Sequence, residues 1–314
     1  MNLSALAASV RAHPGLRDKR HLAAVAGTLG GDGDDAAVVP EGEGSLVMAA
    51  EAIRPAFVAA QPRAAGIAGV VTVLNDLAAT GARPIALLDC LVAGSGELAR
   101  EILEGLRIGA ALYGVPVVGG HATIEGSAAP ALSTFAVGRA RAPLAARNAR
   151  AGDPVSLAVC LEGEMVRGPE GSFFSHLRGP RRDRAAADLA LLAEAAEAGE
   201  AWAARDVSMP GVAGSLLQFC ESAGGLGCAL DLGALPVPPG APLQDWLLCF
   251  PSYAFLLAGD PAALAARFGA AGLTLARLGT LDDSGTLRLR AGGREEPVWD
   301  LSWEDLTGLH PPAR

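Results

Sequence analysis

Short apolar runs of strand length alternate with longer stretches of helical periodicity along this chain, and the alternation narrows the possible folds more than any other feature. Residues 45–53 and 85–93 form apolar runs that predict strands. Between them, residues 63–81 carry apolar side chains at helical spacing and stop at the breaker sequence GARP. Alternation of this kind, without a fixed repeat, predicts an α/β fold.

The alternation continues to the carboxyl end of the chain. We expect further helices at residues 97–113, 183–199, 211–225, 243–248 and 261–271. We expect further strands at residues 115–118, 132–138, 155–161, 227–232, 253–258, 274–281 and 286–290. Residues 162–182, rich in Gly, Pro and Arg, predict an excursion or mobile loop, and the last dozen residues predict a tail.

Length and composition predict two domains. The 314 residues exceed what one hydrophobic core usually serves, and a hydrophobic content of 51% permits two cores. Residues 143–154 are loop-like, and the strand and helix alternation begins again after them. We therefore predict domains at residues 1–146 and 147–314.

Charge and cysteine usage exclude several classes of protein. With 34 acidic against 25 basic residues, the net charge of −9 would repel nucleic acid and anionic membranes. The five cysteines are never spaced as CxxC, which predicts buried thiols in a reducing cytosol rather than disulfides or a zinc site. The chain starts without the pattern of a signal peptide and has no apolar run of bilayer-spanning length. We therefore expect a soluble, cytoplasmic protein.

The densest polar signal is the sequence GDGDDAAVV at residues 31–39. Gly33 allows a tight backbone conformation, and the carboxylates of Asp32, Asp34 and Asp35 repel one another unless a cation joins them. Mg²⁺ bridged to phosphate suits such a loop, because it needs only one or two protein carboxylates. A solvated acidic turn is the alternative interpretation.

A second signal interrupts the apolar pattern of the expected helix at residues 63–81, where Asn75 and Asp76 lie. A charged group in apolar surroundings must pair, bind a metal or reach water, so Asp76 is either a metal ligand or the partner of an arginine. Glu51, followed by Arg54, is embedded in apolar sequence in the same way and is a further candidate ligand.

A third signal is VGGHAT at residues 118–123, at the end of an expected short strand. Gly119 and Gly120 would permit close approach of the backbone to a ligand. His121, two residues before Thr123, could contact phosphate or act as a base, and a hydrogen-bonded structural histidine is the alternative.

A fourth signal, RDVSMPGVAGSL at residues 205–216, predicts a turn that carries Asp206 and then a helix that starts near Pro210. Exposed amides at such a start can hold an anion. The alternative is an ordinary helix start capped by Ser208.

In this order, the four segments resemble the superfamily of aminoimidazole ribonucleotide synthetase, thiamine-monophosphate kinase, selenophosphate synthetase and the hydrogenase-maturation carbamoyl dehydratase. GDDAAVV resembles the GDDAA motif of that superfamily, NDLAATGARP its NDLAAMGA helix, and VVGGHATIEG its second glycine-rich strand end. DVSMPGVAGSLLQFCESAGGLGCALDL is similar to its DxSDGG helix and the strand that follows. The resemblance covers residues from about 31 to about 258.

The resemblance implies two α/β domains per chain and a homodimer in which the amino-terminal domains pair into a shared β barrel. It also implies that ATP and Mg²⁺ bind at the dimer interface and that the γ-phosphate is transferred to an acceptor. The site residues it implies are Asp34, Asp35, Asp76 and Glu51 for the metal, Gly33, Asp34, Asp35, Asn75, Asp76, Gly119, Gly120 and Thr123 for ATP, and His121 and Asp206 for catalysis.

Departures from the family patterns argue against three specific activities. The first cysteine is Cys90, too late for selenophosphate synthetase, and the chain ends PPAR rather than in the cysteine of the carbamoyl dehydratase. Thiamine-monophosphate kinase usually has Asp where Glu51 and His121 stand, and SDG where residues 208–211 stand. The pattern is closest to an uncharacterised set of proteins related to aminoimidazole ribonucleotide synthetase.

Two classes of function follow. The first is a Mg-dependent, ATP-using enzyme of the transferase or ligase type that phosphorylates an oxygen of an unknown small acceptor and releases ADP. Arginines within residues 162–182 would suit an anionic acceptor, and a solvated loop is the alternative. The second class is an inactive nucleotide-binding scaffold or regulatory subunit, and a fold of this kind could also bind another phosphate compound.

Overall fold

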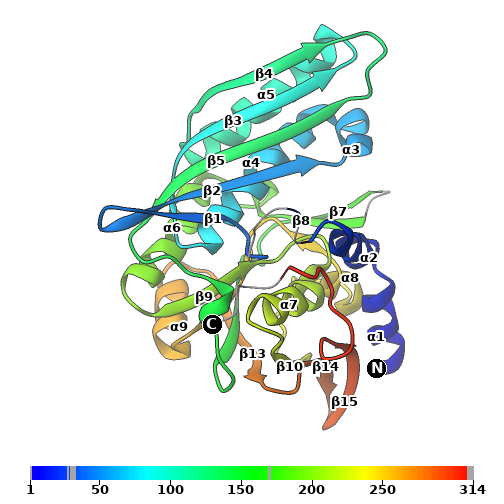
Figure 1. Ribbon diagram of the computed structural model, residues 1–314, viewed down its shortest axis with the longest axis vertical. Helices are drawn as coiled ribbons and strands as arrows, with labels where there is room; N and C mark the ends of the chain where they lie inside the picture. Colours follow the sequence, from blue (N-terminus) through cyan, green and yellow to red (C-terminus); the bar gives the residue numbers. More distant parts are fainter. Residues whose placement is uncertain (1, 27, 29–32, 169–170, 310–314) are drawn as a thin grey trace. The chain divides into compact units, whose positions relative to one another are not determined.

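The computed structural model describes residues 2–26, 28, 33–168 and 171–309 of the chain (Figure 1). Its contacts divide the chain into two compact units. The small unit consists of Asp35–Pro143 and Arg181–Glu194, and the large unit consists of Met1–Asp34, Leu144–Pro180 and Ala195–Arg314.

These units differ from the expected domains at residues 1–146 and 147–314. One boundary, after Pro143, lies within three residues of the expected position, but Met1–Asp34 belongs to the large unit and Arg181–Glu194 to the small one. The first exchange has a physical cause, because helix α1 (Leu3–Ala12) buries its apolar side chains in the core of the large unit. Local sequence pattern does not reveal which core a helix joins.

The small unit is built on a five-stranded sheet with strand order β1-β2-β5-β3-β4. Its strands are β1 (Ala37–Glu41), β2 (Gly44–Ile53), β3 (Arg83–Ala93), β4 (Val117–Ile124) and β5 (Ala131–Ala140). All neighbours pair antiparallel except β3 and β4, which are parallel. The chain goes from β2 through α3 (Pro55–Ala60) and α4 (Pro62–Ala79) to β3, and α5 (Gly96–Tyr113) connects the two parallel strands.

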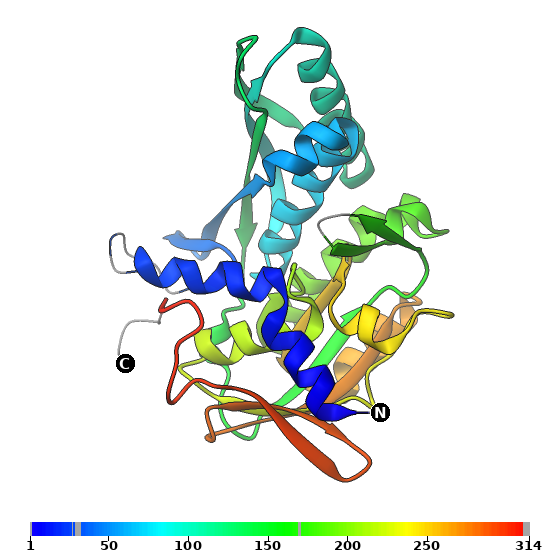
Figure 2. The same ribbon diagram turned by 90° about the vertical axis from the view of Figure 1, so that its right-hand side faces the viewer.

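Helices α4 and α5 lie together against one face of this sheet (Figures 1 and 2). They approach closely because glycines face each other's backbone: a Cβ on Gly66 would lie 2.2 Å from the Ile102 carbonyl oxygen, and one on Gly105 would lie 2.1 Å from that of Arg63. The Ser95 hydroxyl accepts a hydrogen bond from the Leu98 amide and starts α5.

The opposite face of the five-stranded sheet, called the open face here, carries exposed apolar side chains. Met48 on β2, Leu88 on β3 and Phe135 on β5 are 45%, 42% and 37% exposed. Leu88 and Phe135 are direct partners in the strand register. Side chains of this size on neighbouring strands form an apolar patch in the isolated chain.

The large unit is built on a seven-stranded sheet with strand order β15-β14-β10-β13-β6-β12-β9. Its strands are β6 (Pro154–Val159), β9 (Ala201–Asp206), β10 (Gly227–Asp231), β12 (Ala254–Gly259), β13 (Thr274–Asp282), β14 (Thr286–Ala291) and β15 (Arg294–Asp300). Helix α7 (Gly211–Ser222), all twelve residues of which are buried, packs on this sheet. Its other helices are α1, α2 (Pro14–Arg20), α8 (Leu243–Leu247), α9 (Pro261–Ala270) and the end of α6 (Ala185–Glu197).

The expected α/β architecture is confirmed, and three local expectations were wrong. The strand expected at residues 115–118 is β4, Val117–Ile124, so the glycines of VGGHAT lie inside a strand and not at its end. Residues 162–182 include a hairpin, β7 (Glu164–Gly168) and β8 (Gly171–Ser175), which forms a three-stranded sheet with β11 (Phe250–Pro251). The expected tail is packed as far as the described residues go, since Leu306 is fully buried.

Within the described residues, neither the five-stranded sheet nor the seven-stranded sheet closes into a barrel. Among its described helices, none is both long and apolar enough to cross a membrane.

Candidate functional site

Two of the predicted metal ligands meet in the small unit. A carboxylate oxygen of Asp35, just before β1, and one of Asp76, in the last turn of α4, lie within 4.8 Å of each other. Asp76 is only 7% exposed, whereas Asp35 is half-buried. Two carboxylates at this spacing can share one divalent cation, and oxygen ligands suit Mg²⁺. This pair of residues therefore fits the predicted metal.

The end of α4 explains why a cation is favourable beside Asp76. The carbonyl end of a helix carries partial negative charge, so a carboxylate in the last turn adds charge of the same sign. The backbone there is fixed, because the Thr80 hydroxyl donates to the Asp76 carbonyl oxygen at 3.0 Å. Gly81, at φ +72°, then turns the chain out of the helix toward β3. Asn75, beside Asp76, is fully buried.

Asp34 is used differently from its neighbour Asp35. Its Oδ2 accepts a hydrogen bond of 2.9 Å from the amide of Ala146, at the start of the short 3₁₀ helix η2 (Ala146–Asn148), and both residues belong to the large unit. Asp34 and Asp35 are both predicted metal ligands; the Asp35 carboxylate lies within 4.8 Å of that of Asp76, whereas the Asp34 carboxylate accepts this backbone hydrogen bond. Asp32, from the same motif, lies outside the described residues.

The residue before Asp34 is held by two side chains for which the sequence pattern predicted no role, Arg205 and Ser222. The carbonyl oxygen of Gly33 accepts hydrogen bonds from the Ser222 hydroxyl at 2.8 Å and from Arg205 Nη1 at 3.1 Å. Gly33 has φ +71°, a conformation that favours glycine. Gly33 is thus anchored to α7 and β9 of the large unit.

Glu51 lies in a cross-strand row that also contains Gly120 of the Gly-Gly segment. It is the register partner of Thr134, which is the partner of Asp89, which in turn is the partner of Gly120. A Cβ on Gly120 would lie 2.3 Å from Asp89 Oδ1. The close approach that requires glycine there is to the Asp89 carboxylate. Burial raises the pKa of Asp89 above its ordinary value.

His121 and Thr123 lie on β4, with every residue of that strand exposed. The His121 Nε2 and the Thr123 hydroxyl are 3.4 Å apart. In the register, His121 is the partner of Cys90, and Cys90 is the partner of Ser133. The Leu88 side chain, two residues from Cys90, points to the open face, so this row of side chains lies on the open face as well.

Asp206 ends β9 in the large unit and is buried. Helix α7 begins five residues later at Gly211 without a side-chain cap, so the alternative of a helix start capped by Ser208 is not what the structure has. Instead, the Ser208 amide donates to the Ser215 hydroxyl at 2.9 Å. The turn before α7 is therefore stabilised from within the helix.

Arginines of the segment at residues 162–182 are engaged in ion pairs. Arg167 lies 2.8 Å from Asp245, and Arg178 lies 3.7 Å from Glu164, each with more than half of the arginine side chain exposed. Exposed pairs of this kind are weak, and they leave the guanidinium groups open to solvent.

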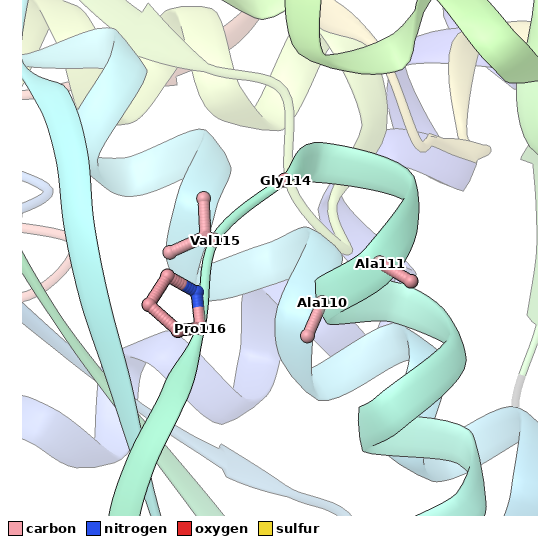
Figure 3. Close-up of a pocket in the computed structure, with 5 residues that line it drawn as sticks. All are labelled: Ala110, Ala111, Gly114, Val115 and Pro116. Carbon is pink, nitrogen blue, oxygen red and sulfur yellow. The ribbon is translucent and has the colours of Figure 1, made fainter.

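A shallow pocket at the end of α5 offers no chemistry of this type (Figure 3). Its lining residues are Ala110, Ala111, Gly114, Val115 and Pro116, and none carries a polar side-chain group. It cannot hold a phosphate or a metal through side chains.

Comparisons with known proteins agree with this fold. The model of the family described as "AIR synthase related protein, N-terminal domain" matches residues 33–140. An uncharacterised protein of Synechocystis, sll0787, is 33% identical over 294 residues, which cover 88% of this chain and 86% of that protein. The structure of T. maritima PurL complexed with ATP matches with a TM-score of 0.76 at 20% identity and covers all of this chain. AaThiL complexed with AMPPCP and TMP matches with a TM-score of 0.65 at 17% identity and covers 85% of this chain.

The fold and the motif order define the class, a two-unit α/β protein of the AIR synthase type. This chain belongs to the AIR synthase-related family. It spans 53% of the T. maritima PurL chain and 91% of the AaThiL chain.

Proposed function

We propose that this protein binds ATP with Mg²⁺ and uses it to phosphorylate, and so activate, an oxygen of a small acceptor, releasing ADP. The observation that carries the proposal is the approach of the Asp35 and Asp76 carboxylates within 4.8 Å. Support also comes from two proteins of the same fold, T. maritima PurL and AaThiL, whose structures contain ATP and AMPPCP.

Asp35 and Asp76 would hold Mg²⁺, which neutralises phosphate charge when bound. In phosphoryl transfer, catalysis consists mainly of positioning and charge stabilisation. The anchored backbone at Gly33 suits this role, because a fixed loop costs little ordering when phosphate binds. We retain Asn75, Gly119, Gly120 and Thr123 as candidate ATP contacts, Asp34 and Glu51 as candidate ligands, and His121 and Asp206 as catalytic candidates.

We further propose that the working form is a homodimer joined through the open face. The exposed apolar side chains of Met48, Leu88 and Phe135 support this, because such a patch on a sheet is typical of a surface that a partner covers. Pairing of two such sheets would produce the β barrel that the family resemblance implies.

A nucleotide-binding scaffold without turnover is the second candidate. It is favoured by the use of the Asp34 carboxylate in a backbone hydrogen bond. That bond occupies one oxygen of a predicted metal ligand.

The test is calorimetry of ATP binding with and without Mg²⁺, for the native chain and for Asp35→Asn and Asp76→Asn. We expect Mg-dependent binding that weakens at least about tenfold in each variant, because a lost ligand charge removes about 1.4 kcal/mol or more. Asp283→Asn, in an exposed turn, is the matched control and should bind as the native chain does.

Absence of ATP binding by the native chain would refute the proposal. Binding without release of ADP in the presence of a panel of small carboxylate, amide and phosphate acceptors would favour the scaffold.

A further inference from the structure

The segment from Leu306 to Leu309 is anchored to helix α7 by one buried carboxylate. Glu221, 2% exposed, accepts hydrogen bonds from the Leu306 amide at 2.7 Å and from the Thr307 amide at 2.9 Å. The Thr307 hydroxyl donates to the other oxygen of Glu221 at 2.7 Å. The Gly308 amide adds a longer contact of 3.4 Å.

The hydrogen bonds to Glu221 are stronger than hydrogen bonds between neutral groups. A carboxylate that accepts several backbone amides is a charge-assisted arrangement, and each such hydrogen bond is worth more than a neutral one. Because the carboxylate is buried, removal of its partners would leave a desolvated charge. The segment is therefore held to α7 tightly, although it was expected to be a tail.

The anchored segment contacts the glycine of the GDGDD motif. The Thr307 hydroxyl also accepts from the Leu309 amide at 3.1 Å, which orients Leu309. A Cβ on Gly33 would lie 2.8 Å from the Leu309 carbonyl oxygen and 3.0 Å from the Leu309 Cβ. Gly33 thus lies directly against Leu309 in the large unit.

Gly33 is consequently enclosed from two directions. On one side its carbonyl oxygen accepts from Ser222, the neighbour of Glu221 on α7, and from Arg205. On the other side it meets Leu309. One end of α7 therefore holds both the loop and the segment that packs on it.

We propose that residues 306–309, locked by Glu221, are a positioning element that sets the backbone of Gly33 and Asp34, the two residues that precede Asp35 in the GDGDD motif. Glu221 and Thr307 are positioning residues and touch no substrate. This inference rests on the proposed function only for its effect on ATP, and its effect on the loop can be measured separately.

The experiment compares full-length Thr307→Val, Thr307→Ser and Glu221→Gln with the native chain. Peptide-level hydrogen exchange is measured across residues 33–36, and ATP binding with Mg²⁺ is measured by calorimetry. Thr307→Val removes the hydroxyl at constant shape, so we expect exchange at residues 33–36 to accelerate about tenfold through easier local opening. The Kd for ATP should rise by about the same factor. Thr307→Ser restores the hydroxyl and should restore both values.

Glu43→Gln removes a carboxylate from an exposed turn of the small unit and is the control for charge. If Glu221→Gln does not fold, the pair of Thr307 variants decides. Unchanged exchange at residues 33–36 in folded Thr307→Val would overturn the inference. An unchanged Kd for ATP in a variant whose exchange accelerates would overturn it as well. If the native chain binds no ATP, the proposed function fails, and the exchange data alone still decide whether the segment holds the loop.

Discussion

At the scale of single residues, the neighbouring carboxylates of Asp34 and Asp35 make different contacts. Asp34 accepts from the Ala146 amide, whereas Asp35, the next residue, approaches Asp76. The sequence singled out the acidic cluster and Asp76 as candidate ligands, and the metal role of these residues stays a prediction. It could not separate the roles of Asp34 and Asp35, because the choice depends on which distant group each carboxylate meets.

Asp89 gives a residue-scale prediction about pH. Burial raises its pKa above the ordinary 3.8, so the folded state binds this proton more tightly than the unfolded state does. Native stability is therefore reduced as the pH rises from 3.8 through the raised pKa of the folded state. We expect Asp89→Asn to melt a few degrees higher than the native chain at pH 7, with the difference vanishing below the ordinary pKa.

Thermal unfolding followed by circular dichroism from pH 3 to pH 8 measures this difference. Asp283→Asn, in an exposed turn, is the control and should leave the melting temperature unchanged. A lower melting temperature of Asp89→Asn at pH 7 would contradict the assignment of desolvation as the dominant cause.

At the scale of elements, the packing of α4 on α5 depends on glycines that helical periodicity does not explain. Gly105 lies in the interior of α5, where glycine is normally unfavourable, yet a Cβ there would collide with the Arg63 carbonyl oxygen at 2.1 Å. We expect Gly105→Ala to destabilise the protein by about 1–3 kcal/mol through overpacking.

Gly96→Ala at the first residue of the same helix is the matched control, because a Cβ there meets nothing within 4 Å. It should be neutral or slightly stabilising. Chemical denaturation of both variants measures the difference, and equal stabilities would show that the two helices can separate without cost.

Strand β4 was predicted from the sequence, but its end was not. The sequence indicated a strand that ends at residue 118, because Gly119 and Gly120 were expected at the strand end, close to a ligand. In the structure the strand continues to Ile124, since pairing with β3 supplies the hydrogen bonds and the Asp89 side chain occupies the space above Gly120. Tertiary pairing here overrides the local preference of glycine.

At the scale of the whole molecule, the open face predicts the oligomeric state. We expect a dimer by light scattering coupled to size-exclusion chromatography, and a monomer for Phe135→Asp, because a charge in an apolar interface is costly. Leu103→Asp, at a similarly exposed leucine on α5, is the control and should remain dimeric.

Cysteine labelling gives an independent measurement of the same prediction. Cys90 is exposed on the open face, whereas Cys160, Cys220, Cys228 and Cys249 are buried. We expect slow reaction of one thiol in the native chain and fast reaction in Phe135→Asp. A native chain that is monomeric at micromolar concentration and labels rapidly would refute the dimer.

The sequence by itself determined the alternation of strands and helices, the order of the polar motifs and the family. These depend on hydrophobic periodicity and on short stretches of neighbouring residues, which act locally. Only the tertiary structure decided that Asp35 meets Asp76, that residues 1–34 join the large unit, and that Glu221 binds a segment 85 residues further on. Each of these depends on burial and on hydrogen-bond partners that come together only when distant parts of the chain pack against each other.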